Sequence, residues 1–288
     1  MNTIFISILI EALPFVLLGV IISGIIQMFI TEEMIAKVIP KNRFLAVLSA
    51  AVVGALFPAC ECGVVPITKR LIAKGVPLHA AIGFMITGPI INPIVLFSTF
   101  IAFGNSWKMV LYRSGLSFAV ALIVGFILSY QFKDSQLRNK ANDHHHHDHD
   151  HGTGILGKLK GTIQHSIDEF FTVGKFLILG AFIAAAMQTF VKTSTLTSIG
   201  HGEYSSSIVM MGLSFILSLC SAADAFIASS FQSTFALNSL VAFLVFGAVF
   251  DIKNTLMMLS VFKSKFVLYL FIYVSVFVFL GSIIIGYL

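Results

Sequence analysis

Long apolar runs separated by short polar breaks make up most of the chain. A helix needs roughly 20 apolar residues to cross the hydrocarbon core of a membrane, and most of the runs approach or exceed that length. They predict spans near residues 4–30, 44–57, 78–103, 109–132, 170–191, 208–231, 240–260 and 266–288. A shorter amphipathic segment lies near residues 64–73. The pattern predicts an all-α integral membrane protein with about eight transmembrane helices.

A hydrophilic loop at residues 133–164 divides the pattern into two halves of similar layout, residues 1–132 and 165–288. Displacing the first half by 159 to 161 residues aligns identical or similar residues in order. The pairs include Phe15 with Phe176, Gly19 with Gly180, Gln27 with Gln188, Cys60 with Cys220, Gly88 with Gly247 and Asn92 with Asp251. Repeated halves are typical of secondary transporters, whose substrate sites lie where broken helices of the two halves meet. The sequence leaves open whether the repeats are parallel or inverted.

The composition favours a membrane protein over a soluble one. Hydrophobic residues make up 57% of the chain and charged residues 11%, whereas soluble domains carry about 25% charged residues. The basic residues that give the net charge of +5 lie mainly in short loops, so they indicate topology and contacts with lipid headgroups, not with nucleic acid. They predict a multi-pass protein of the cell membrane with the central loop in the cytoplasm. Lys108, Arg113, Lys263 and Lys265 then fall on the opposite side, which conflicts with this topology.

Residues 58–66, with the sequence PACECGVVP, predict a broken or re-entrant segment, because two prolines and a glycine do not continue a regular helix. Glu61 is a functional candidate, since ionisable residues at membrane depth are costly. On a regular helix Cys60 and Cys62 would point about 200° apart, but unwound backbone would let both thiols face one soft or borderline cation or metalloid. The alternative is that these cysteines are small apolar packing residues.

The matching positions in the second half carry a third cysteine and a second acid. Cys220 and Asp224 are four residues apart and share a helix face. All three cysteines therefore fall at repeat-equivalent positions. Three thiolates suit trivalent arsenic, and two or three with a carboxylate suit a borderline metal.

A second predicted break lies at residues 88–93, where the sequence is GPIINP. Asn92 and its counterpart Asp251 are candidates for oxygen ligands or for relaying a proton. The alternative is a proline kink that serves packing only, together with an Asp251–Lys253 pair at the membrane interface.

The central loop contains the tract DHHHHDHDH at residues 143–151. Such tracts bind zinc, nickel, copper or cobalt by composition alone. The candidate metal ligands are His144, His145, His146, His147, Asp148, His149 and His151. No cofactor is required for a permease, and a divalent metal such as zinc is expected at this loop. The tract could concentrate or sense a metal, or be a neutral insertion.

Three stretches, FPACECGVVP at 57–66, KGVPLHAAIGFMITGPIINPIVL at 74–96 and CSAADAF at 220–226, resemble the YraQ/YcgR-type predicted permeases. That family is similar to the ArsP organoarsenical permeases. The resemblance covers nearly the whole chain apart from the histidine tract. It implies a polytopic permease with Cys60, Cys62 and Cys220 as candidate substrate contacts. It also implies a second membrane protein as a partner. Binding of trivalent arsenicals by the thiols is implied only for the family branch that contains the ArsP permeases.

We therefore expect a secondary permease, and no enzyme, that moves a small thiophilic metal or metalloid species across the bilayer. The substrate-binding candidates are Cys60, Glu61, Cys62, Asn92, Cys220, Asp224 and Asp251. Burial favours the neutral form of a carboxyl, so Glu61, Asp224 or Asp251 could exchange protons to drive transport. Two alternatives remain: an intramembrane thiol–disulfide oxidoreductase with Cys220 as the resolving thiol, and a metal-sensing subunit of a membrane complex.

Overall fold

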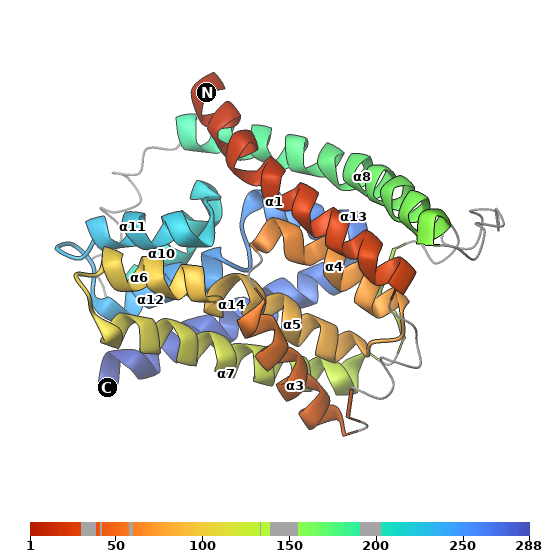
Figure 1. The fold of residues 1–288 in the computed structure, drawn as a ribbon. Coiled ribbons are helices and arrows are strands. Elements are labelled where there is room, and N and C mark those ends of the chain that lie inside the picture. Colours follow the sequence, from red (N-terminus) through yellow and green to blue (C-terminus); the bar gives the residue numbers. More distant parts are fainter. Residues whose placement is uncertain (30–38, 41, 58–59, 133, 139–154, 191–202) are drawn as a thin grey trace.

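The computed structural model describes residues 1–29, 39–40, 42–57, 60–132, 134–138, 155–190 and 203–288. These residues form twelve α-helices and their connections (Figure 1). The helices are α1 (Asn2–Phe29), α3 (Arg43–Leu56), α4 (Glu61–Ala73), α5 (Leu78–Ile91), α6 (Pro93–Ala102), α7 (Trp107–Gln131), α8 (Ile155–Phe190), α10 (Glu203–Leu217), α11 (Ser221–Ser230), α12 (Leu237–Gly247), α13 (Ile252–Val261) and α14 (Ser264–Tyr287). The predicted all-α membrane fold is confirmed.

Six helical stretches of the described residues are long and apolar enough to cross a membrane. They are residues 2–26, 78–102, 107–131, 170–190, 237–261 and 264–287. Two of them are interrupted: α5 and α6 meet at Asn92, and α12 and α13 meet just before Ile252. Asn92 accepts a hydrogen bond from the Val95 backbone N–H at 2.9 Å, and Pro93 begins α6. A capping side chain followed by proline starts a new helix, which confirms the predicted break near residues 88–93.

Helices α3 and α4 form a re-entrant hairpin. Val47 packs against Gly83, and Thr87 Oγ1 donates to the Ala51 carbonyl at 2.9 Å, so α3 runs parallel to α5. Helix α4 then returns and joins α5 through a short turn at Gly75. Helices of 14 and 13 residues are only about 20 Å long, too short for a hydrocarbon core of about 30 Å. The break is shorter than predicted, because α4 begins at Glu61 and contains Pro66.

Helices α10 and α11 form a second hairpin of the same kind. Ser206 and Ser239 share a hydrogen bond of 2.7 Å, and Ser214 packs against Gly247, so α10 runs parallel to α12. Residues 208–231, predicted as one span, therefore do not cross the bundle. The chain reverses because Ser218 adopts a left-handed conformation with φ of 48°, a local distortion that a polar residue tolerates better than a bulky one.

The two hairpins enter the bundle from opposite ends. At one end, here called the loop end, Lys263 N–H bonds the Gln136 carbonyl at 2.9 Å, and Arg43 at the start of α3 bonds the Ser129 carbonyl at 3.2 Å. At the other end, Tyr204 at the start of α10 bonds Tyr287 at the end of α14. Opposite entry supports an inverted form of the predicted repeat, which stays a proposal.

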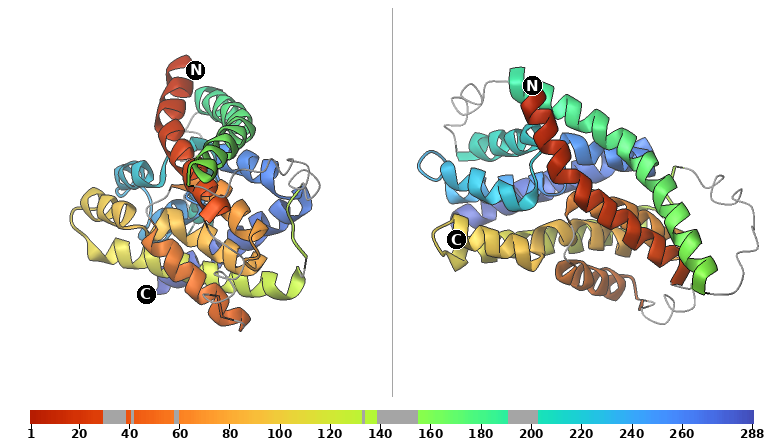
Figure 2. Two further views of the ribbon diagram at one scale, coloured as in Figure 1. Left: turned by 45° about the vertical axis from the view of Figure 1, so that its right-hand side comes forward. Right: turned by 45° about the horizontal axis from the view of Figure 1, so that its top comes forward.

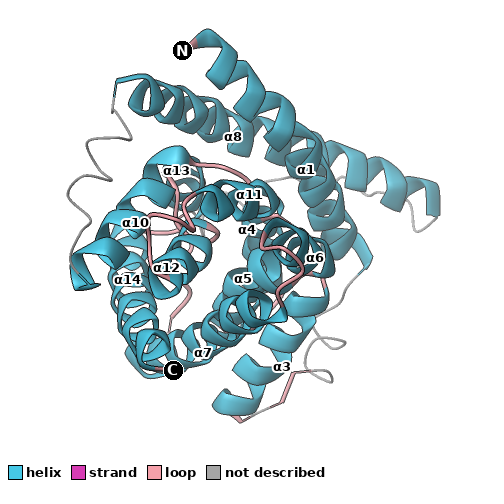
Figure 3. Cartoon of the chain, turned by 90° about the vertical axis from the view of Figure 1, so that its left-hand side faces the viewer, coloured by secondary structure: helices cyan, strands magenta, loops and turns pink. Residues whose placement is uncertain are grey.

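Helices α1 and α8 lie side by side along one flank of the bundle (Figures 2 and 3). Helix α1 packs on α4, and α8 packs on α13. A Cβ atom at Gly19 would lie 2.6 Å from the Gly63 Cα, and one at Gly180 would lie 2.6 Å from the Lys253 Cα. Glycine at both places therefore permits the backbones to approach closely, as small residues do in membrane helix pairs.

Candidate functional site

Four helices begin at the breaks inside the bundle, and each begins at a predicted site residue. Cys60, Asn92, Cys220 and Asp251 are the N-cap residues of α4, α6, α11 and α13. Cys60, Asn92 and Asp251 are buried, and Cys220 is half-buried. Helix starts leave backbone N–H groups without intrahelical partners, so the four breaks gather polar groups within an otherwise apolar bundle.

Lys253, in the first turn of α13, joins three of these breaks. Its Nζ lies 3.3 Å from Glu61 Oε1 and also bonds Asp251 Oδ2. It donates further to the carbonyls of Ser218 and Leu219, at 3.0 and 3.2 Å. Lys253 is only 3% exposed. The Asp251–Lys253 pair considered as one alternative therefore exists, but it lies inside the bundle and not at the membrane interface. A buried charge is tolerated when paired and hydrogen-bonded in this way.

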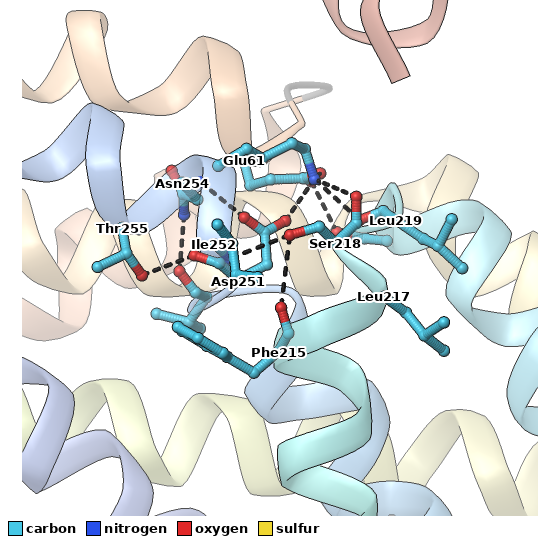
Figure 4. Close-up of polar contacts among 12 residues, drawn as sticks. Glu61, Phe215, Leu217, Ser218, Leu219, Asp251, Ile252, Asn254 and Thr255 are labelled. Atoms are coloured by element: carbon cyan, nitrogen blue, oxygen red, sulfur yellow. Dashed lines mark hydrogen bonds and ion pairs between the residues drawn. The ribbon is translucent and has the colours of Figure 1, made fainter. Parts of the chain in front are cut away.

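Asp251 also organises its own break (Figure 4). Its Oδ1 accepts from the Asn254 backbone N–H at 2.6 Å, which caps α13. Beside it, Ser218 Oγ accepts from the Ile252 N–H at 3.0 Å. The α10–α11 turn and the α12–α13 break are therefore joined by side-chain hydrogen bonds in addition to the Lys253 contacts.

Glu61 connects the two hairpins. Its Oε2 accepts a hydrogen bond from Ser221 Oγ at 3.0 Å, while Oε1 faces Lys253. Glu61 lies in the first turn of α4, where the helix dipole stabilises negative charge. One carboxylate thus joins α4, α11 and α13.

Two further buried ionisable residues, Arg113 and Asp224, lie beside this cluster. Arg113 of α7 is fully buried, with Nη1 donating to Thr99 Oγ1 at 2.7 Å and Nη2 to the Ser221 carbonyl at 2.9 Å. The basic-residue pattern counted Arg113 with the charges on the side opposite the central loop, but the residue lies inside the bundle and therefore indicates no sidedness. Asp224, in the first turn of α11, is 1% exposed. Asp224 Oδ1 and Arg113 Nε are buried without a hydrogen-bond partner.

The three cysteines line one cavity between α1, α4 and α11. Glu61, Lys253 and four side chains of α1, Glu11 and Phe15 among them, complete its wall. All three cysteines are free thiols. The cavity measures about 10 Å³, which is about the least space that holds one water molecule. The structure is thus closed around the thiols.

The remaining candidates are not part of this cavity wall. Asn92 donates to the Gly88 carbonyl at 3.4 Å and caps α6. Asp251 pairs with Lys253, and Asp224 lies in the first turn of α11. The histidine tract at 143–151 lies outside the described residues. Within the described part of the chain, no three His, Cys, Asp or Glu side chains lie close enough together to hold a metal ion.

Sequence reasoning missed three residues that organise the site: Arg113, Lys253 and Ser221. Arg113 was visible as a lone basic residue inside an apolar run, and Lys253 as a lysine two positions after Asp251. Ser221 carried no signal of its own, because its role depends on contacts with residues more than 100 positions away.

Comparison with known proteins gives consistent matches along the whole chain. The family model ArsP_1, described as a predicted permease, matches residues 1–287. The chain is 68% identical over 285 residues to UPF0718 protein YcgR of Bacillus subtilis (strain 168), covering 99% of this chain and 96% of the relative. It is 46% identical over 265 residues, 92% of this chain and 88% of the relative, to a putative two-component membrane permease complex subunit of Streptococcus mutans serotype c. No solved structure matches the chain.

Replacing Lys253 by methionine should strongly destabilise the protein, because Glu61 and Asp251 would lose their buried counter-charge. Removing one partner of a buried ion pair costs about 3–5 kcal/mol. Thermal unfolding of the purified protein in detergent measures the effect. Lys265→Met, an exposed lysine of α14, is the matched control and should leave the unfolding temperature unchanged. Lys253→Met combined with Glu61→Gln should recover part of the loss, and no recovery would contradict the pairing with Glu61.

Proposed function

Because the chain belongs to the ArsP_1 family of predicted permeases, we propose that this multi-pass membrane permease is a secondary carrier of a small thiophilic metal or metalloid species. The solute would bind in the cavity between α1, α4 and α11. Transport would be coupled to protons through the buried carboxyls of the same region.

The observation that supports this proposal is that all three cysteines of the chain line one cavity. Cys60 and Cys62 come from the α3–α4 hairpin, and Cys220 comes from the α10–α11 hairpin. Cys60 and Cys220 stand at the starts of α4 and α11, two of the four helices that begin inside the bundle. Thiolates select soft and thiophilic ions. Since no three ligands among the described residues are at metal-binding distance in this closed conformation, binding would require α1 to withdraw and the thiols to close on the solute.

The arrangement of α1 and α8 suggests how the cavity opens. In this conformation α1 packs on α4 and α8 on α13, the half-helices of the loop end. An inverted repeat can exchange the conformations of its two halves, which produces alternating access. The exchange would bring α1 onto α6 and α8 onto α11. The faces that would receive them are uncovered, as Ile94 and Phe226 are 63% and 51% exposed.

The loop end is proposed to face the cytoplasm. Among the described residues, it gathers Arg43, Lys69, Arg70, Lys74, Arg138, Lys263 and Lys265. Lys263 lies at this end, where its backbone N–H bonds the Gln136 carbonyl, so it adds to this excess of basic residues. An excess of basic residues marks cytoplasmic loops, so the excess supports a cytoplasmic histidine tract.

The relative from Streptococcus mutans is named as a subunit of a two-component complex. On that basis we propose that a second membrane protein assembles with this chain. A chain that transports by itself in proteoliposomes would exclude an obligatory partner.

Uptake into proteoliposomes tests the solute and the thiols. We expect transport of one species among Zn(II), Co(II), Cu(I) and trivalent arsenicals, and we expect Cys60→Ser to lower it by at least about tenfold, because even outer-shell changes at metal sites cost that much. Deletion of residues 143–151 is the control and should leave transport in place. Full transport by Cys60→Ser would contradict the thiol site.

Paired cysteines test the exchange of α1 and α8. Ser23 Oγ lies 3.5 Å from the Pro66 carbonyl in this conformation, and the repeat-equivalent pair is Ala184 and Phe226. The test uses a background variant in which all three native cysteines are replaced by serine. In this background a bifunctional thiol reagent should link Ser23→Cys to Pro66→Cys in the present conformation. It should link Ala184→Cys to Phe226→Cys in the exchanged conformation. A link at one pair should prevent the link at the other. Absence of the Ala184–Phe226 link would contradict the exchange.

Zinc is the metal proposed for the histidine tract, with His144, His145, His146, His147, Asp148, His149 and His151 as ligands. We expect calorimetry to show zinc binding that is lost when residues 143–151 are deleted. A membrane-impermeant reagent should reach a tag in the tract only from the cytoplasmic face. Zinc binding that survives the deletion, or labelling from outside, would contradict these two assignments.

A further inference from the structure

The buried charges at the centre of the bundle do not balance. Three carboxyls, Glu61, Asp224 and Asp251, face two cations, Arg113 and Lys253, and each of these five residues is at most 3% exposed. Glu11 lies at the cavity wall and is only half-buried, so it is not counted with these three. A net charge in a dry interior is costly, so the cluster requires one additional positive charge in this conformation.

Arg70 does not supply that charge. It is buried in the last turn of α4, nine positions after Glu61, which places it about 13 Å further along the helix. Arg70 also has interactions of its own.

Two of the three carboxyls are held as carboxylates. Glu61 accepts from Ser221 and pairs with Lys253, and Asp251 caps α13 and also bonds Lys253. Both oxygens of each group therefore face donors. A carboxylate whose lone pairs are satisfied by charged and neutral donors is stable when buried.

Asp224 differs, because its Oδ1 is buried and has no hydrogen-bond partner. Arg113 directs Nη1 to Thr99 and Nη2 to the Ser221 carbonyl. The other oxygen, Oδ2, lies 3.3 Å from the position of a Cβ atom at Gly247, so it packs against the break between α12 and α13. An unsatisfied oxygen of this kind costs far less on a neutral carboxyl than on a carboxylate.

We propose that Asp224 is the proton-binding residue of this permease and carries the balancing proton in the closed conformation. A hard metal ion fits less well, because such ions take six or more oxygen ligands and Asp224 Oδ1 has no polar partner. This inference rests on the proposed function only for its use in transport. The proton site itself follows from the charges and contacts of the cluster.

Release of the proton would be transmitted to the cavity through Ser221. When the O–H bond of Asp224 breaks, the proton passes to water and the carboxylate pairs with Arg113, whose Nε is free. Arg113 would then leave the Ser221 carbonyl. Because Ser221 Oγ holds Glu61, and Glu61 and Lys253 line the cavity beside the thiols, the change reaches the solute site through one residue.

Infrared spectroscopy of the full chain in lipid at neutral pH tests the proposal without any solute. The wild-type protein should show a carboxyl C=O band that shifts in deuterated water and is lost in Asp224→Asn. Asp134→Asn, an exposed aspartate of the loop end, is the matched control and should keep the band. Asp224→Glu should restore a shifted band. An unchanged band in Asp224→Asn would overturn the proposal.

Thermal unfolding gives an independent readout. Asparagine resembles a neutral aspartic acid, so Asp224→Asn should unfold within a few degrees of the wild-type protein at neutral pH, whereas Asp251→Asn should lose stability. A large loss of stability in Asp224→Asn would mean that Asp224 is an ionised partner of Arg113, which contradicts the proposal. Neither readout depends on transport, so failure of the carrier proposal and failure of the proton site remain distinguishable.

Discussion

The ammonium group of Lys253 is the interaction on which the centre of the structure depends. It is buried, and it binds two carboxylates and two backbone carbonyls that come from the α4 start, the α10–α11 turn and its own α13 start. Broken helices expose carbonyls and N–H groups that lipid cannot satisfy. The lysine supplies donors to those carbonyls, and the carboxylates stabilise the lysine. The backbone groups at the helix breaks and the Lys253 ammonium group therefore stabilise each other. Each would be costly to bury without the other.

Local features of the sequence predicted the parts of the fold that local chemistry decides. Asn92-Pro93 starts a helix because asparagine caps the first turn and proline is favoured at the first helical position, and apolar runs give membrane helices. The single span expected at 208–231 failed because the reversal at Ser218 lies between two apolar stretches and involves no proline or glycine. The burial of Arg113 could not be predicted either, because its partner Ser221 is 108 positions away. Glu61, Asp224 and Asp251 could be selected from the sequence because acidic residues are rare in apolar segments. The residues that contact Glu61 could not, because they lie far away in the sequence.

One wall of the closed cavity, helix α1, takes no part in the ion pairs of Lys253. Helix α1 meets α4 through the glycine contact of Gly19 with Gly63, and it contributes Glu11 and Phe15 to the cavity. The ion pairs of Lys253, in contrast, join α4, α11 and α13. Glycine contacts give a smooth backbone surface with little side-chain interlock. Sliding or tilting α1 would thus open the thiols while Glu61 and Lys253 stay paired.

A carrier needs the energy of its driving ion to reach the solute site, and the placement of Ser221 offers a short route. Ser221 immediately follows Cys220, its hydroxyl holds Glu61, and its carbonyl holds Arg113. A change in the charge of Asp224 alters the donors that Arg113 has available, and the α11 start then shifts with both a thiol and the Glu61 bond attached. Coupling of this kind requires two discrete arrangements of one packed element. Helix α11, ten residues long and anchored at its first turn by the contacts of Ser221, would be that element in the proposed mechanism, because a small rotation of its start would move the Cys220 thiol and Asp224 together.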